Sequence, residues 1–78
     1  MNLDEIAFLQ ELGRRLRDRR TELGLTQQEL GERCDLHRTF IGSVERGERN
    51  VSILNVRTIA KALKLPIAEL FQNLRKWE

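Results

Sequence analysis

The feature that most constrains the fold is the stretch from Gln27 to Arg46, which contains two short helical segments joined by a turn of only three residues. Helices joined so tightly cannot lie antiparallel as in a bundle hairpin, so they must cross at a steep angle. Such a crossing requires apolar residues at particular offsets and a small residue where the two backbones touch. The stretch supplies Gly31 as the small residue and apolar side chains at Leu30, Cys34, Leu36, Ile41 and Val44.

Helix start and stop signals divide the rest of the chain in the same way. Residues that favour helix N-caps stand at Asn2, Thr26 and Ser52, and residues that end helices stand at Gly24, Gly47 and Pro66. Between these signals, apolar residues recur at three- and four-residue spacing. The sequence therefore predicts an all-α fold, a compact five-helix bundle with helices over about residues 3–23, 26–34, 37–46, 52–63 and 66–76. We expect residues 1–78 to form a single domain.

Composition argues against several classes of function. With one cysteine and one histidine, the chain lacks the residues that a metal site or a nucleophile–base pair requires. We therefore expect no enzymatic activity, no cofactor and no metal, and a buried thiol at Cys34. No apolar run approaches the ~20 residues that span a bilayer. The acidic start, Met1–Glu5, does not resemble a signal peptide, so we expect a cytoplasmic protein with no membrane partner.

Four segments resemble the phage-repressor-like helix-turn-helix regulators, the Cro/C1-type or XRE family: Leu12–Arg17, Gly24–Leu30, Ile41–Gly47 and Ile59–Leu63. Within that family, Leu36–Ile41 and Glu45–Val51 are most similar to the controller proteins of restriction–modification systems. The resemblance implies a dimeric DNA-binding regulator whose helix-turn-helix covers about residues 27–46. Two positions depart from the family pattern, because Asp35 stands where glycine is usual and Gly31 where alanine is usual.

The second helix of the pair is the one that the resemblance places in the major groove of DNA, where only outward side chains reach base edges. Phe40, Ile41 and Val44 are expected to face inward. The expected base-reading residues are Arg38, Thr39, Ser43 and His37, with Gly42 and Arg46 also facing outward. Arg38 is the strongest candidate because its fork can bind guanine bidentately. A phosphate contact or a surface ion pair remains the alternative for Arg38.

Other polar residues are placed to hold the DNA backbone. Gln27 starts the first helix of the pair, where free backbone N–H groups favour a phosphate, as the resemblance also implies. The expected phosphate-binding residues are Gln27, Arg46, Arg49, Asn50 and Arg20. Arginine supplies 11 of the 14 basic residues, although the net charge is only +2. The other arginines of the first helix are equally compatible with a solvated face that carries ion pairs such as Arg14–Asp18.

The C-terminal helices, about residues 52–76, carry more apolar residues than one small core needs, and the resemblance places a dimer contact there. The expected interface residues are Ile53, Leu54, Ile67, Phe71 and Leu74. Alternatively, Leu54, Phe71 and Leu74 close the core of the monomer. Phe8 or Leu9, from outside the matched segments, is expected to pack against the last helix.

The leading hypothesis is a transcriptional regulator that binds a near-palindromic DNA operator as a homodimer. If the protein activates transcription, RNA polymerase is a further partner, contacted through Glu29, Glu32 or Glu45. One alternative is an antitoxin whose main partner is a toxin and which regulates its own promoter. Another is a scaffold or RNA-binding adaptor that ignores DNA sequence.

Overall fold

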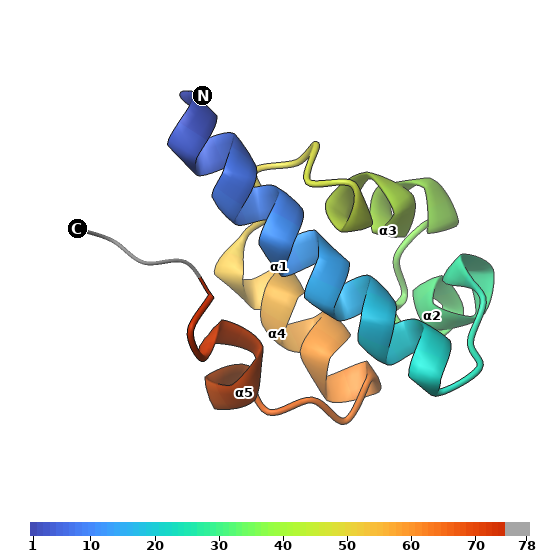
Figure 1. Ribbon diagram of the computed structural model, residues 1–78. Helices are drawn as coiled ribbons and strands as arrows, with labels where there is room; N and C mark the ends of the chain where they lie inside the picture. Colours follow the sequence, from blue (N-terminus) through green and yellow to red (C-terminus); the bar gives the residue numbers. More distant parts are fainter. Residues whose placement is uncertain (75–78) are drawn as a thin grey trace.

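The computed structural model describes residues 1–74, whose regular structure is entirely helical. The helices are α1 (Leu3–Glu22), α2 (Gln27–Cys34), α3 (Arg38–Glu45), α4 (Ile53–Ala62) and α5 (Ile67–Phe71). The long helix α1 crosses the molecule, with α3 beside its middle and α2 near its C-terminal end, while α4 and α5 lie on its other side (Figure 1). The predicted all-α fold with five helices is confirmed.

The helices begin at the residues that the sequence predicts as caps. Asn2 accepts a hydrogen bond from the Glu5 N–H at 2.8 Å, and the Glu5 carboxylate accepts one from the Asn2 N–H at 3.0 Å. Thr26 and Glu29 form the same reciprocal capping box at the start of α2. The Thr26 backbone N–H that donates to Glu29 lowers the pKa of that carboxyl. Ser52 caps α4 through the Asn55 N–H.

The turn between α2 and α3 depends on two unusual residues. Asp35 has φ 58° and ψ 42°, the left-handed conformation that its short polar side chain tolerates. A Cβ added to Gly31 would collide with the Leu36 carbonyl oxygen. The Leu36 N–H donates to the Gly31 carbonyl at 2.9 Å, so the two backbones touch where the sequence predicts a small residue. In this turn, Gly31 is therefore needed for close approach.

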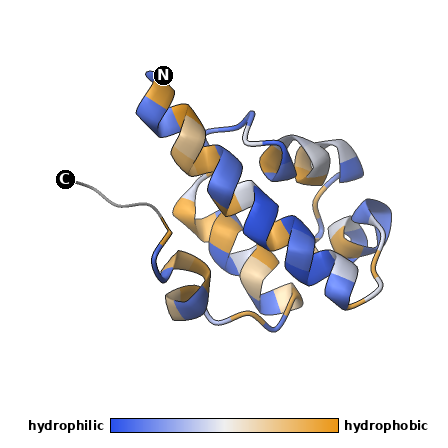
Figure 2. Ribbon diagram, in the orientation of Figure 1, coloured by the Kyte–Doolittle hydropathy of each residue, from blue (hydrophilic) through white to orange (hydrophobic). Residues whose placement is uncertain are grey.

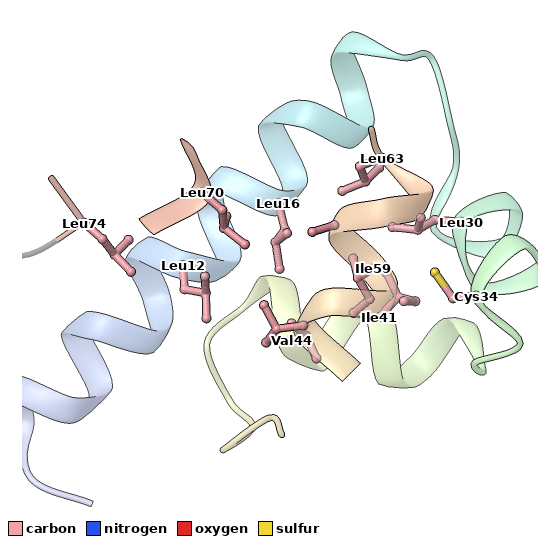
Figure 3. Close-up of a cluster of buried hydrophobic side chains, with 12 residues drawn as sticks. Leu12, Leu16, Leu30, Cys34, Ile41, Val44, Ile59, Leu63, Leu70 and Leu74 are labelled. Carbon is pink, nitrogen blue, oxygen red and sulfur yellow. The ribbon is translucent and has the colours of Figure 1, made fainter. Parts of the chain in front are cut away.

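The core lies between α1 and α4, and α2, α3 and α5 close its remaining sides (Figure 3). It is built from Leu12, Leu16, Leu30, Cys34, Ile41, Val44, Val56, Ile59, Ala60, Leu63, Leu70 and Leu74. Figure 2 shows α4 as largely apolar, whereas the outward side of α1 is mostly hydrophilic beyond its first turns. Fully burying one leucine stabilises the fold by roughly 1.5–3 kcal/mol. The Cys34 thiol is buried as predicted, and burial raises its pKa.

The last helix is shorter than predicted, because α5 ends at Phe71 and not near residue 76. Gln72 is extended and Asn73 has φ 52°, so the chain turns away from the helix. The cause lies in α1, where the Arg15 guanidinium donates to three carbonyls at this end, those of Leu70, Gln72 and Asn73. These bonds satisfy acceptors that a longer helix would have paired internally. Residues 75 and 76 of the predicted helix lie outside the described residues.

Arg15 is itself held by a neighbour on α1. The Glu11 carboxylate accepts hydrogen bonds from both Arg14 and Arg15, which lowers its pKa from 4.5 to about 2. Phe8 stacks on Phe71 with 6.4 Å between ring centroids, which confirms the predicted packing of the chain start against the last helix. The end of α5 is therefore joined to α1 twice, by the aromatic contact of Phe8 and by the hydrogen bonds of Arg15.

Two glycines with the same backbone conformation give a direct test of close packing. Gly24 and Gly47 both have φ +73°, but a Cβ at Gly47 would lie 2.6 Å from the Gln10 Cα, whereas one at Gly24 would meet nothing within 4 Å. We expect Gly24→Ala to lower the free energy of unfolding by about 1–2 kcal/mol, the cost of a left-handed non-glycine residue. Gly47→Ala should cost about 1–3 kcal/mol more through overpacking. Urea denaturation followed by circular dichroism measures both, and equal losses would contradict the role of the Gln10 contact.

Candidate nucleic-acid interface

Helix α3 has a buried side and an exposed side. Ile41 and Val44 are buried and Phe40 is half-buried, as predicted, while His37, Arg38 and Thr39 are exposed at the start of the helix. Three polar residues are therefore exposed together at the start of this helix. The prediction that Gly42 faces solvent is wrong, because this residue is buried. The Gln27 amide and the Arg46 guanidinium cover the place where its Cβ would lie.

The first residues of this exposed side are joined to each other. His37 is the N-cap of α3, and its Nδ1 accepts a hydrogen bond from the Thr39 N–H at 3.1 Å. The same Nδ1 lies 2.8 Å from the Thr39 hydroxyl oxygen. Two of the residues predicted to read bases are therefore held in one fixed arrangement, next to Arg38.

The far end of α3 carries a second polar group. The Ser43 hydroxyl donates to the Phe40 carbonyl at 2.8 Å and accepts from Arg49 Nε at 3.2 Å. The Arg49 guanidinium carbon lies 5.0 Å from the centre of the Phe40 ring, within the range of a cation–π interaction. Arg49 belongs to the loop after α3, so these contacts bring a predicted phosphate-binding residue beside a predicted base-reading one.

Arg46 and Asn50 complete the exposed group at this end. Arg46 pairs with Glu48 at 3.0 Å, and the hydrogen bond that its guanidinium donates to that carboxylate raises the pKa of Arg46. Both arginine and glutamate are well exposed, so this ion pair stabilises the protein only slightly. It can exchange for a phosphate without loss of a buried contact.

The prediction that Arg20 binds a DNA phosphate is wrong. Its guanidinium is buried and donates to both carboxylate oxygens of Glu45, from Nε at 2.6 Å and from Nη2 at 3.0 Å. A further hydrogen bond runs to the Leu25 carbonyl at 2.6 Å. Because these partners enclose the charged group, Arg20 cannot reach a phosphate without breaking the pair.

The buried pair extends to the surface through Gln27. The Gln27 side-chain amide donates to Glu45 Oε1 at 3.0 Å and is itself only partly exposed. Glu45 therefore joins α1, α2 and α3 through one carboxylate. Because Glu45 is buried, the prediction that it contacts polymerase is wrong. The other two residues of that prediction, Glu29 and Glu32, are exposed on α2.

The residues predicted at a dimer interface divide into two groups. Ile53 and Leu54 are 62% and 67% exposed, Ile67 is 36% exposed and Phe71 is half-buried. Leu74 is only 4% exposed and belongs to the monomer core, so its assignment to the interface is wrong. The alternative that Leu54 closes the core is also wrong. Ile53 and Leu54, at the start of α4, and Ile67, at the start of α5, are therefore exposed apolar side chains.

The interior of the described chain offers no second kind of site. No three His, Cys, Asp or Glu side chains come together there to hold a metal ion. Every buried side-chain nitrogen or oxygen in residues 1–74 has a hydrogen-bond partner. None of the described helices is long and apolar enough to cross a membrane.

Comparison with known proteins agrees with this arrangement. A match to the helix-turn-helix family spans residues 16–70. The control protein C.MunI of a Mycoplasma species is 37% identical over 76 residues, which are 97% of this chain and 99% of the relative. The chain belongs to the helix-turn-helix family and, within it, to the family of restriction–modification controller proteins. The control protein C.SmaI of Serratia marcescens is 44% identical over 59 residues, 76% of this chain and 70% of that one.

Solved structures of controller proteins have the same fold. The controller protein C.AhdI from Aeromonas hydrophila is 46% identical and superposes with a TM-score of 0.82 over 87% of this chain and 99% of that one. The C.Esp1396I tetramer, solved in complex with its natural 35-base-pair operator, is 31% identical with a TM-score of 0.77 over 86% and 88% of the two chains. The family resemblance predicted from the sequence is thereby confirmed.

The roles of Arg20 and Arg15 were missed by the sequence reasoning, although a signal for Arg20 was present. Arg20 lies four residues after Leu16, on the same side of α1 as the buried leucines. Glu45 likewise lies four residues after Ile41 on the buried side of α3. Opposite charges on two buried helix faces indicate a buried pair, because an unpaired charge there is costly. The sequence contains no comparable signal for the role of Arg15, because its hydrogen-bond acceptors are backbone carbonyls, which every residue has.

We expect the buried pair to dominate the electrostatic stability of the fold. Glu45→Ala leaves the Arg20 guanidinium buried without an anion and should lower the free energy of unfolding by about 3–5 kcal/mol. The matched control is Asp18→Ala, which removes the exposed partner of Arg14 at 2.7 Å and should cost less than about 1 kcal/mol. Thermal unfolding followed by circular dichroism measures both. Similar small losses in the two variants would show that Arg20 finds water or another partner.

Proposed function

We propose that this controller protein is a cytoplasmic, homodimeric transcriptional regulator that binds a near-palindromic operator through α3. The observation that carries the proposal is the exposed surface of that helix. His37, Arg38 and Thr39 stand at its start and Ser43 lies one turn further on, with Arg49 beside it. A helix that presents such groups beside a basic loop fits the major groove, where side chains distinguish base pairs by hydrogen-bond pattern.

Arg38 is proposed as the principal base-reading residue. It is exposed at the first position of α3, and within residues 1–74 its guanidinium takes part in no hydrogen bond or ion pair. An uncommitted guanidinium can donate two parallel hydrogen bonds to guanine O6 and N7 without first losing a partner. Thr39 and Ser43 are proposed to contact a thymine methyl or a phosphate, and His37 a base or phosphate acceptor.

The DNA backbone is proposed to be held at both ends of α3. Gln27 starts α2, where the helix N-terminus favours a phosphate. Arg46, Arg49 and Asn50 follow α3 and are all exposed. Contacts of this kind fix the position of the protein on DNA and carry little sequence information. The hydrogen bond from the Gln27 amide to Glu45 holds the Gln27 side chain in place, which supports a phosphate contact at a fixed position in the interface.

Dimerisation is proposed through the apolar patch of Ile53, Leu54 and Ile67, extended by Phe71. Ile53 and Phe71 also line an apolar groove of about 300 Å³, together with Phe8 and Val51. A two-fold dimer places two recognition helices about one DNA turn, roughly 34 Å, apart. The operator-bound C.Esp1396I tetramer supports oligomeric binding by a protein of this fold. If the dimer activates transcription, Glu29 and Glu32 are the exposed acidic residues of α2 for contact with polymerase.

The proposal is tested by selecting bound duplexes from a random DNA library at near-physiological salt. We expect enrichment of an inverted repeat with half-site centres about ten base pairs apart. Sedimentation of the protein with the selected duplex then gives the stoichiometry, expected to be two chains for each repeat. Folded protein that enriches no sequence, or that binds every duplex equally, would overturn the proposal.

Two arginine substitutions separate base reading from phosphate binding. Arg38→Ala should weaken binding to the selected operator by about 1–3 kcal/mol and relax the preference at one base position. Arg49→Ala should weaken binding to every duplex alike and reduce the slope of log affinity against log salt by about one. Fluorescence anisotropy with operator and scrambled duplexes over a range of salt concentrations measures both effects.

Arg14→Ala is the control for both variants. Arg14 is exposed on α1 and lines a shallow hollow with Leu65 and Glu69, to which no residue of α3 contributes. Its removal should leave affinity, base preference and salt slope unchanged. Equal weakening on all sequences by Arg38→Ala would reassign Arg38 to the DNA backbone.

A further inference from the structure

Four of the five glycines in the chain have a role in folding that Gly42 does not share. Gly24 and Gly47 have left-handed backbones. A Cβ at Gly13 or Gly31 would collide with a backbone carbonyl oxygen. Gly42 lies inside α3 without a left-handed backbone, and the three atoms nearest to an added Cβ belong to the ends of side chains. Because glycine inside a helix is less stable than alanine, Gly42 weakens α3 without serving the backbone.

Two polar side chains meet over Gly42. A Cβ on this residue would lie 3.1 Å from Arg46 Nη1 and 3.3 and 3.5 Å from the side-chain oxygen and nitrogen of Gln27. The amide and the guanidinium therefore lie close together over one point of α3, although they come from the start of α2 and the end of α3. Gly42 is buried beneath them. The absence of a side chain at this position is what allows the two groups to meet.

The two covering side chains differ in how firmly they are held. The Gln27 nitrogen donates to Glu45 Oε1 at 3.0 Å, and that carboxylate is buried. The Arg46 guanidinium pairs with Glu48, and both members of this pair are well exposed. A methyl group on Gly42 would approach Arg46 more closely than ordinary van der Waals contact allows. Since Gln27 is tied to a buried group, Arg46 is the side chain that would have to move away.

The groups over Gly42 offer hydrogen-bond donors to one anion. The Gln27 nitrogen carries two hydrogens and gives one of them to Glu45. The Arg46 guanidinium carries five N–H donors and gives its Nε–H to Glu48. The first backbone N–H groups of α2, which begins at Gln27, have no acceptor within their helix. A phosphate oxygen of the DNA backbone is negatively charged and only accepts hydrogen bonds, so it matches these donors.

We propose that Gly42 is the positioning residue of one phosphate site, made of the Gln27 amide, the Arg46 guanidinium and the first N–H groups of α2. The ligand is a single phosphate of the operator backbone. The inference rests on the proposed function, which assigns both side chains to the DNA backbone, and adds that they bind the same phosphate. The missing side chain at Gly42 has two opposite effects, because it weakens α3 and strengthens DNA binding. A glycine needed only for packing would strengthen both.

The effect on the fold is tested in the free protein by urea denaturation followed by circular dichroism. Gly42→Ala should unfold at the same or a higher urea concentration than the wild type, because alanine favours the helix and the ion pair that moves is exposed. The matched control is Gly31→Ala, inside α2, whose Cβ would collide with the Leu36 carbonyl and which should unfold at a lower concentration. A midpoint for Gly42→Ala below that of the wild type would make Gly42 a packing residue and overturn the inference.

The effect on DNA binding is measured by fluorescence anisotropy with the selected operator and a scrambled duplex over a range of salt concentrations. Gly42→Ala should weaken binding to both duplexes about tenfold, the size of one hydrogen bond to a charged group. The slope of log affinity against log salt should fall by about one. In an Arg46→Ala protein the same change should leave the slope as it is, because the displaced charge is already absent.

The outcomes separate this inference from the proposed function. Unchanged affinity and slope in Gly42→Ala, or a further fall of the slope when it is combined with Arg46→Ala, would overturn the shared phosphate site. A loss confined to the operator would also overturn it, because a phosphate contact does not distinguish sequences. A wild type that binds operator and scrambled duplex equally would refute the proposed function alone, since the salt slopes still decide whether Gly42→Ala removes a phosphate contact.

Discussion

The buried pair of Arg20 and Glu45 is the interaction on which the arrangement of the helix-turn-helix depends. Two charges taken out of water are stable only when their geometry is good and their remaining donors and acceptors are satisfied. Here the contact is bidentate, and the Leu25 carbonyl and the Gln27 amide bind further atoms of the pair. Since the four residues come from α1, the following loop, α2 and α3, a change in the angle between any two of these elements would break a buried charged bond. The pair therefore selects one relative orientation of α2 and α3.

Such a pair requires α1 and α3 to approach closely, and glycine makes this possible. A Cβ at Gly13 would collide with the Val44 carbonyl and lie 2.5 Å from the Glu45 carbonyl oxygen. Gly47 permits a similar approach to Gln10, one turn earlier on α1. These two close contacts hold the end of α3 directly against α1, which brings Glu45 within hydrogen-bond distance of Arg20. Interactions within the hydrophobic core then add stability without having to fix the angle of the recognition helix.

The sequence was most informative where structure is set by neighbouring residues. The helix N-caps at Asn2, Thr26 and Ser52 are local features, and all three were predicted correctly. The end of α5 was not, because Arg15 sets it from 55 residues away in the chain. Arg20 was placed on DNA for the same reason: its charge suggests exposure, and only the tertiary fold brings Glu45 to it. The exposed side of α3 was predicted, but the coupling of His37 to Thr39 and of Ser43 to Arg49 requires side-chain positions.

The exposed apolar patch on α4 and α5 connects the small size of the chain to its proposed role. A domain of this size buries only about 60% of the surface of its unfolded chain, so its core leaves little stability in excess. Ile53 and Leu54 would gain from a second copy what the monomer core does not give them. A single α3 also presents too few base-reading groups to define a long site, whereas two copies related by a two-fold axis double them. Association would thus serve stability and specificity through the same side chains, with the buried pair in each copy holding the recognition helix at the angle that both halves of an operator require.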